Sequence, residues 1–318
     1  MAGRKGANFY VALGVAANAL WGAAFIVPYA LHDFPSELIT IFRYGVYGVV
    51  SLVMLLFSGL GSMRFSLPIF MMGNAISFCG NVGYYFFLTL GIKYAGFVYP
   101  ALFVGLLPVS VILLGMVQDK FQMPFRLLPG IALIVCGIVL INYLNVNDSS
   151  GLLLDGDPVR GIIFSLISLL LLTIYCIANA RFLKSNVGVS SLRWAGLLGV
   201  CALWQSVLLS FFALMFAGYD ISVFRTYSAD RLIAFLSGVI FLGIFVSYLA
   251  MWMWNVSSRY ISSIMAGRLL CLETIFALAY GYALDARIPR ELEFLGICLI
   301  VLGGYLVQRS AERVNMAA

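Results

Sequence analysis

Glu273 is an ionisable residue in the middle of the long apolar stretch formed by residues 266–285. A carboxylate at the centre of a helix exposed to lipid costs about 2.5 to 3.5 kcal/mol on insertion scales, so its presence calls for a compensating role. Three roles compete for this carboxylate. It holds helices together through Arg43 or backbone donors, it binds the cationic group of a small molecule, or it takes up and releases a proton.

Two basic residues, Arg43 and Arg268, also fall inside apolar stretches. Arg268 precedes Glu273 by about five residues in one predicted helix, so the two side chains point in different directions around the helix axis. It also lies near the end of that helix, from which a long side chain can extend to the membrane surface. Arg43 belongs to a different predicted helix and is therefore the better placed of the two to meet Glu273.

Other polar and aromatic residues near the middle of the predicted spans are candidates for lining a path through the protein. They are Asn18, Trp21, Asn81, Tyr84, Tyr85, Tyr99, Tyr175, Asn179, Trp204, Gln205, Tyr248 and Trp252. Aromatic walls with a few amide dipoles suit a zwitterionic or amphipathic small molecule, whose hydrocarbon part stacks while its polar ends bind fixed partners. The alternative is structural, because rings also pack between helices or at membrane interfaces, and amides also hydrogen-bond between helices.

The composition requires a membrane environment for these residues. The chain has 318 residues, of which 63% are hydrophobic and 10% are charged, whereas soluble domains carry about 25% charged residues. Long aliphatic runs with scattered glycines predict an all-α integral membrane protein rather than a barrel. We predict ten spans, at residues 9–31, 38–58, 68–92, 97–117, 127–144, 161–180, 195–217, 232–255, 263–284 and 292–308.

Several classes of function are disfavoured by what the sequence contains. The six cysteines all fall inside predicted spans without C-x-x-C spacing, and we expect them to be buried small hydrophobic residues. The only histidine, His32, lies in a predicted connection. Without a Walker motif, a metal-ligand cluster or a nucleophile arrangement, we expect no cofactor, no metal, no ATP-driven step and no enzymatic activity. The basic residues are dispersed among short loops, so nucleic acid is not an expected partner.

The charge distribution predicts the orientation in the membrane. Placing the N-terminus in the cytoplasm puts most of the 19 lysines and arginines on the cytoplasmic side, as the positive-inside rule requires. Both termini are then cytoplasmic, and the predicted location is a bacterial inner membrane. The sequon-like Asn147-Asp148-Ser149 lies in a predicted outside loop and leaves a eukaryotic compartment open.

The two halves of the chain resemble each other. When Asp119 is aligned with Asp285, Lys93-Tyr94 falls on Arg259-Tyr260, Gly130 falls on Gly296 and Gly137 falls on Gly303. We therefore predict two five-helix repeats, residues 1–150 and 151–318. Because five is an odd number, the second repeat enters the membrane from the opposite side, and such inverted repeats are typical of transporters with alternating access.

Several motifs resemble the drug/metabolite transporter superfamily, in particular its ten-helix members built from two EamA-type repeats. The stretches NALWGAAFIVPYAL, PSELITIFRYGVYGVVSL and FVGLLPVSVILLGMVQDKF are similar to the first, second and fourth helices of that family, and LCLETIFALAYGYALD is similar to the ninth. Thr274 stands where the family usually has proline, and Gln118-Asp119 and Leu284-Asp285 replace its usual Gly-Glu pairs. Residues 174–182 and 251–260 also resemble the YddG-type amino-acid exporters.

The resemblance implies a secondary transporter that exports a small metabolite, most similar to an amino acid, across the bilayer. Protons are a coupling partner if Glu273 takes up and releases a proton. Two alternatives stay open. One is an importer or exchanger of a nucleotide-sugar or cofactor, for which Arg43 and Arg268 would supply few intramembrane cations. The other is a sensor or assembly protein that uses the same scaffold without transport.

Overall fold

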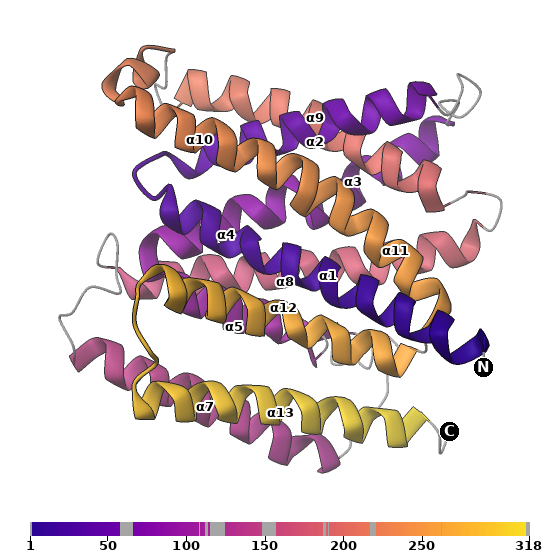
Figure 1. The fold of residues 1–318 in the computed structure, drawn as a ribbon, viewed down its shortest axis with the longest axis vertical. Coiled ribbons are helices and arrows are strands. Elements are labelled where there is room, and N and C mark those ends of the chain that lie inside the picture. The colour runs from indigo at the N-terminus through magenta and orange to yellow at the C-terminus, as the bar shows by residue number, and fades with distance from the viewer. Residues whose placement is uncertain are drawn as a thin grey trace.

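A computed structural model of the chain (Figure 1) describes residues 2–57, 66–107, 109–111, 114, 125–147, 157–186, 189, 191–216, 221–261 and 263–315. The regular elements in this part of the chain are all helices. Their bounds are α1 Ala2–Ala30, α2 Ser36–Phe57, α3 Leu67–Gly80, α4 Val82–Ala95, α5 Val98–Gly105, η2 Phe125–Leu127, α7 Leu128–Asn147, α8 Pro158–Ser185, α9 Ser191–Phe216, η3 Ile221–Thr226, α10 Ala229–Phe241, η4 Leu242–Leu249, α11 Ala250–Tyr260, α12 Ser263–Leu284 and α13 Glu291–Asn315.

The prediction of a helical membrane protein is confirmed. Six described segments are long and apolar enough to cross a membrane: Asn8–Ala30, Ser36–Phe57, Leu67–Ala95, Pro158–Leu183, Leu192–Met215 and Ala229–Ser257. Leu128–Gly137 and Leu269–Leu284 are shorter apolar helices. Described helices overlap each of the ten predicted ranges, although only the first part of the range 97–117 is described.

Two of the predicted spans are interrupted. The range 68–92 is divided between α3 and α4 at Asn81, whose φ of −127° and ψ of −96° are not helical. The range 232–255 contains the π-helical segment η4 between α10 and α11. Single π-helical turns insert an extra residue and change the direction of side chains, and they are frequent at functional sites. The tight turn after α4 is formed by Gly96, whose φ of 69° favours glycine.

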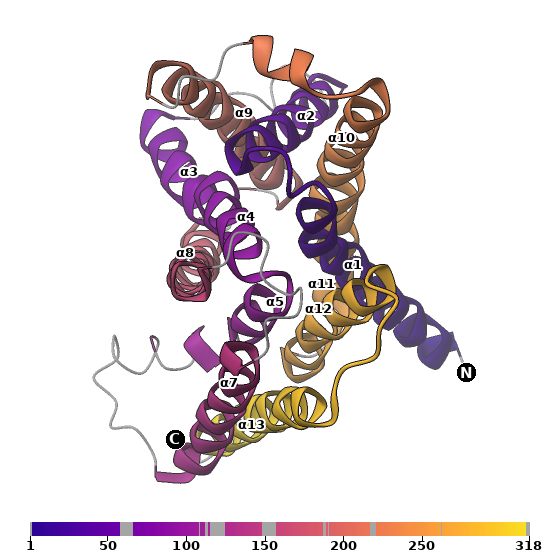
Figure 2. The ribbon, with the colours of Figure 1, turned by 90° about the vertical axis from the view of Figure 1, so that its left-hand side faces the viewer.

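The helices lie side by side, and several contacts join segments that are far apart in the sequence (Figure 1). Seen end-on, α3, α4 and α8 form one side, and α1, α10, α11 and α12 form the other; the α2–α9 pair lies at one extremity and the α7–α13 pair at the other (Figure 2). Glycines let backbones approach closely. A Cβ at Gly303 would lie 2.5 Å from the Gly130 carbonyl oxygen, and one at Gly137 would lie 2.6 Å from the Gly296 carbonyl oxygen.

Both ends of the chain lie at the same end of the bundle (Figure 1). We call this the N-terminal end; it carries the start of α1 and α9 and the end of α2 and α11. The far end carries Ala30, Asp33, Tyr227 and Asp285. Ser257 of α11 donates to the Tyr10 carbonyl oxygen at 2.7 Å near the N-terminal end, so α1 is attached to the second half of the chain there.

Polar contacts between the two halves of the chain connect the helices at the far end. Arg231 forms an ion pair with Asp33, and its Nε donates to Asp33 at 3.0 Å. The Tyr227 hydroxyl donates to the Asp33 carbonyl oxygen at 2.8 Å, and the Phe34 ring stacks on Tyr227 with ring centroids 4.1 Å apart. These contacts join the turn after α1 to the start of α10.

A second polar cluster at the far end surrounds the turn between α12 and α13. The Tyr29 hydroxyl donates to Asp285 at 3.0 Å, and Arg287 pairs with Glu293 at 3.0 Å. Burial opposes the charge of Arg287, but the hydrogen bonds and negative charge of Glu293 outweigh it, so the pKa of Arg287 is raised above its ordinary value. The far end therefore carries several fixed, charged contacts.

The expectation that the cysteines are buried is wrong for part of the set. All six have free thiols, and Cys201 is buried, but Cys136 and Cys298 are exposed on the surface of the bundle. A position within a span does not determine burial between helices, because lipid accepts an apolar side chain as readily as a neighbouring helix does. Among the described residues, no group of three or more histidine, cysteine or acidic residues could hold a metal ion.

Candidate functional site

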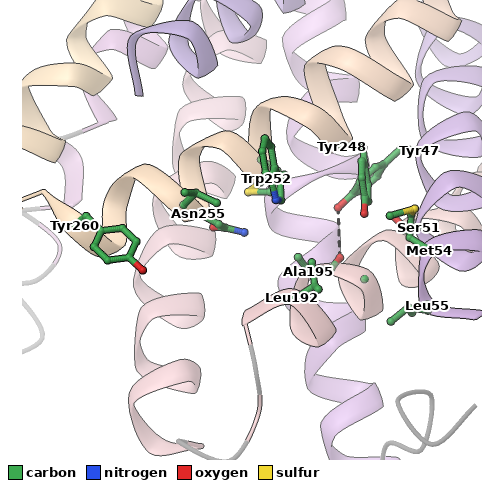
Figure 3. A pocket seen from close by; sticks show the side chains of 13 residues that line it. Tyr47, Ser51, Met54, Leu55, Leu192, Ala195, Tyr248, Trp252, Asn255 and Tyr260 are labelled. Carbon is green, nitrogen blue, oxygen red and sulfur yellow. Dashed lines mark hydrogen bonds between the residues drawn. The ribbon is translucent and has the colours of Figure 1, made fainter. Parts of the chain in front are cut away.

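A cavity of about 390 Å³ lies between α2, α9 and the η4–α11 segment, towards the N-terminal end of the bundle (Figure 3). The residues that line it are aromatic, aliphatic and uncharged polar: Tyr47, Ser51, Met54, Leu55, Leu192, Ala195, Gly196, Tyr248, Met251, Trp252, Asn255, Val256 and Tyr260. The Tyr47 hydroxyl donates to the Ala195 carbonyl oxygen at 3.5 Å across the cavity wall. Trp252 and Tyr260 are 46% and 63% exposed, so the described part of the chain leaves this side of the cavity partly uncovered.

The sequence identified part of this cavity. Tyr248 and Trp252, predicted to share a helix face, both line it. The analysis of the sequence missed Tyr47, Ser51 and Asn255. The signal for the first two is a polar stripe on α2, on which the buried residues Ser36, Thr40, Tyr44, Tyr47 and Ser51 recur every three or four positions and Arg43 lies beside them.

Arg43 lies one helical turn deeper than Tyr47 on α2. It is only 5% exposed, and its Nε donates to the Ser247 hydroxyl at 3.0 Å. The centre of its guanidinium lies 3.8 Å from the centroid of the Tyr85 ring and 5.2 Å from that of Tyr44. At these distances a ring face attracts a cation. The π-helical segment η4 supplies Ser247, and the break before α4 precedes Tyr85 by a single turn.

Glu273 lies in the interior of the bundle on α12 and is partly buried. It is within electrostatic range of Arg43, Tyr84 and Cys176. Although both residues are described, Arg43 and Glu273 form no direct ion pair in the described part of the chain. The neighbouring Thr274 donates to the Ala101 carbonyl oxygen at 3.2 Å and so fixes this turn of α12 against α5. The side chain of Arg268 lies outside the described parts of the structure.

Four further candidates lie in or beside the interior. Asn18 is fully buried and donates to the Gly14 carbonyl oxygen at 2.7 Å, and its Oδ1 has no hydrogen-bond partner among the residues that the structure describes. Trp21 packs against Trp254 with ring centroids 5.5 Å apart. Tyr99 is buried on α5. Asn81, at the break between α3 and α4, donates to Ser77 at 3.2 Å.

The remaining candidates join helices or face outward. Asn179 accepts a hydrogen bond from Trp194 at 2.6 Å, and Gln205 donates to the Asn74 carbonyl oxygen at 2.8 Å. Tyr175 packs against α3, where a Cβ at Gly80 would lie 2.1 Å from its ring. Trp204 is 54% exposed on the surface of α9. The structure therefore does not bring these four side chains to the cavity of Figure 3.

Comparison with known proteins supports the membrane assignment. No family model matches the sequence. The chain is 25% identical over 301 residues to "Inner membrane protein YtfF" of Escherichia coli strain K12, and the match covers 92% of this chain and 93% of that protein. A solved structure described as "Crystal structure of protein" shares the fold with a TM-score of 0.64 at 18% identity, over 96% of this chain and 98% of the other. The chain is thus a multi-pass helical membrane protein, similar over nearly its whole length to an inner membrane protein.

Proposed function

We propose that the protein is a secondary transporter that exports small metabolites, amino acids or amino-acid-like compounds, by alternating access. The observation that carries this proposal is the cavity between α2, α9 and α11, which has aromatic walls and includes Tyr47, one helical turn from the buried Arg43. Such a lining suits a small molecule with an apolar body and charged ends. The choice of amino acids and the outward direction rest on the resemblance to the drug/metabolite transporters.

The packing of α7 against α13 supports the proposed inverted repeat. Gly130 and Gly296 occupy equivalent positions in the two halves, as do Gly137 and Gly303. A Cβ at Gly130 would lie 2.8 Å from the Gly303 carbonyl oxygen, and Gly137 faces Gly296 in the same way. The Gly130–Gly303 contact and the Gly296–Gly137 contact are therefore equivalent. Such a repeated contact is expected for two units related by a two-fold axis. Ten spans in two units, residues 1–150 and 151–318, follow from this proposal.

The two ends of the bundle differ in a way that fits alternating access. The far end carries the Asp33–Arg231 and Arg287–Glu293 ion pairs, while the cavity lies towards the N-terminal end and has exposed residues in its wall there. With both termini in the cytoplasm, as we propose, this arrangement is the state in which an exporter binds its cargo from inside the cell. Glu273 then binds the cationic group of that cargo or a coupling proton from within the path.

The test is flux of labelled amino acids through the purified protein in proteoliposomes, with and without a pH gradient. We expect flux above that of protein-free vesicles. We expect Glu273→Gln to lower it by about ten-fold or more, because an amide neither binds an ammonium group as an ion pair nor carries a proton between compartments. If flux through the wild-type protein is the same with and without the pH gradient, Glu273 does not couple transport to protons. Absence of flux for every solute contradicts transport and favours a sensor or assembly protein.

A further inference from the structure

Arg43 is a buried cation whose hydrogen-bonding capacity is only partly used. Its Nε donates to Ser247, but its buried Nη1 has no hydrogen-bond partner among the described residues. A guanidinium has five N–H donors in a planar fork that matches the two oxygens of a carboxylate. An intramembrane cation without an ionic partner is costly, and such residues mark substrate or ion pathways. The guanidinium therefore keeps buried donor capacity that the described side chains do not use.

The surrounding side chains fix the plane of the guanidinium without neutralising it. The centre of the guanidinium lies over the Tyr85 ring, 3.8 Å from its centroid, and the Tyr85 hydroxyl is itself held by donation to the Ala24 carbonyl oxygen at 3.2 Å. Ser247 holds the Nε edge. Both neighbours are uncharged, so they orient the cation but leave its charge available. A fixed, charged fork is what bidentate binding of a carboxylate requires.

The position of Arg43 connects it to the cavity. Tyr47, one turn along α2, and Tyr248, adjacent to Ser247 in the chain, both line the cavity wall. Arg43 and Ser247 therefore form the next layer beneath that wall. A molecule that moved inward from the cavity would meet the guanidinium before it reached the far end of the bundle.

The acidic residues at the far end already have other partners. Asp33 pairs with Arg231, and Glu293 pairs with Arg287. Glu273 is the acidic residue within electrostatic range of Arg43, yet the two form no ion pair in the described part of the chain. The two opposite charges thus act on each other in the interior without a direct ion pair, and an α-amino acid carries the complementary pair, a carboxylate and an ammonium group, on one carbon atom.

We propose that Arg43 binds the carboxylate of the transported molecule and thereby selects α-amino acids, whose ammonium group faces Glu273. This inference rests on the proposed transport function and assigns the specificity of the same site. Compounds without a carboxylate lose the Arg43 contact, and compounds without an ammonium group lose the Glu273 contact. Arg43 is then a specificity-determining residue rather than a structural partner of Glu273.

The test is binding to the purified protein in detergent, measured by isothermal titration calorimetry. The probes are phenylalanine, phenylalanine amide, which lacks the carboxylate, and N-acetylphenylalanine, which lacks the ammonium group. We expect wild-type protein to bind phenylalanine about ten- to a hundred-fold more tightly than the amide, the range typical of a charged hydrogen bond. In Arg43→Gln this preference should vanish. In Glu273→Gln the preference over the amide should persist, and the preference over N-acetylphenylalanine should vanish.

Two further variants separate binding from folding. Arg43→Lys keeps the charge but not the planar fork, so it should retain a reduced preference for the carboxylate. Arg225→Gln removes an exposed arginine from η3 and should behave as wild type. Two results for Arg43→Gln would overturn the inference. One is that the variant still binds phenylalanine more tightly than phenylalanine amide, and the other is that its affinity for all three probes falls by the same factor. Proteoliposomes report separately on transport: flux of phenylalanine with unchanged selectivity in Arg43→Gln rejects only this inference, whereas absence of flux in wild type rejects the transport function.

Discussion

Ala195→Trp is expected to lower transport strongly in a folded protein. Ala195 lines the cavity between α2, α9 and α11 (Figure 3), and an indole at this position would occupy space that cargo needs. Since the site is already open, the larger side chain should be accommodated without forcing helices apart. We expect flux in proteoliposomes to fall by about ten-fold or more, because the indole would fill a large part of the cavity and narrow the space left for cargo.

A matched control introduces the same side chain elsewhere on α9. Leu208 is 40% exposed on the surface of the bundle, where lipid should accept a tryptophan. Leu208→Trp should therefore transport as wild type, and both variants should elute as single species in size-exclusion chromatography. Normal flux through well-folded Ala195→Trp protein would show that the cavity of Figure 3 is not on the transport path.

Gly303→Leu is expected to be strongly destabilising. A Cβ at this position would lie 2.5 Å from the Gly130 carbonyl oxygen and 3.0 Å from the Ile134 backbone nitrogen. Because both contacts are with backbone atoms, α7 and α13 must separate to admit any side chain. Overpacking of this kind costs about 1–3 kcal/mol, and more where the backbone must shift. The measurement is the midpoint of thermal unfolding in detergent.

The neighbouring glycine provides the control for this prediction. A Cβ at Gly304, on the same helix, would have no atom within 4 Å. Gly304→Leu should therefore leave the unfolding midpoint close to that of wild type. Leucine is a better helix former than glycine at both positions, so equal destabilisation by the two substitutions would show that the effect does not come from close packing of α7 on α13.

The sequence alone determined the class of protein and the approximate positions of its helices. Uninterrupted apolar runs can satisfy their backbone hydrogen bonds in a membrane only as helices or closed barrels, so composition and run length were sufficient for this step. The turn after α4 also depends on local sequence. Gly96, in the gap between the predicted spans 68–92 and 97–117, ends this helix with a positive φ. The intramembrane charges Arg43 and Glu273 could likewise be read directly, because their rarity in apolar segments makes them conspicuous.

The sequence did not predict the interruptions within the helices. The break at Asn81 and the π-helical segment η4 both lie inside runs that read as continuous spans. Local sequence permits a regular helix in each case, and contacts with other helices decide otherwise. Gly243 of η4, for example, packs directly against α2, where a Cβ would lie 2.9 Å from the Arg43 carbonyl oxygen.

Only the tertiary structure decided which polar side chains meet. Arg43 and Ser247 are 204 positions apart in the chain, and neither residue predicts the other. Among the aromatic candidates, Trp252 faces the cavity and Trp204 faces outward, although both lie in apolar helices. In a membrane, an apolar helix has no polar face turned to water, so its sequence does not show which of its faces points into the bundle. The helix–helix contacts set that rotation, and so they determine which candidate residues form the site.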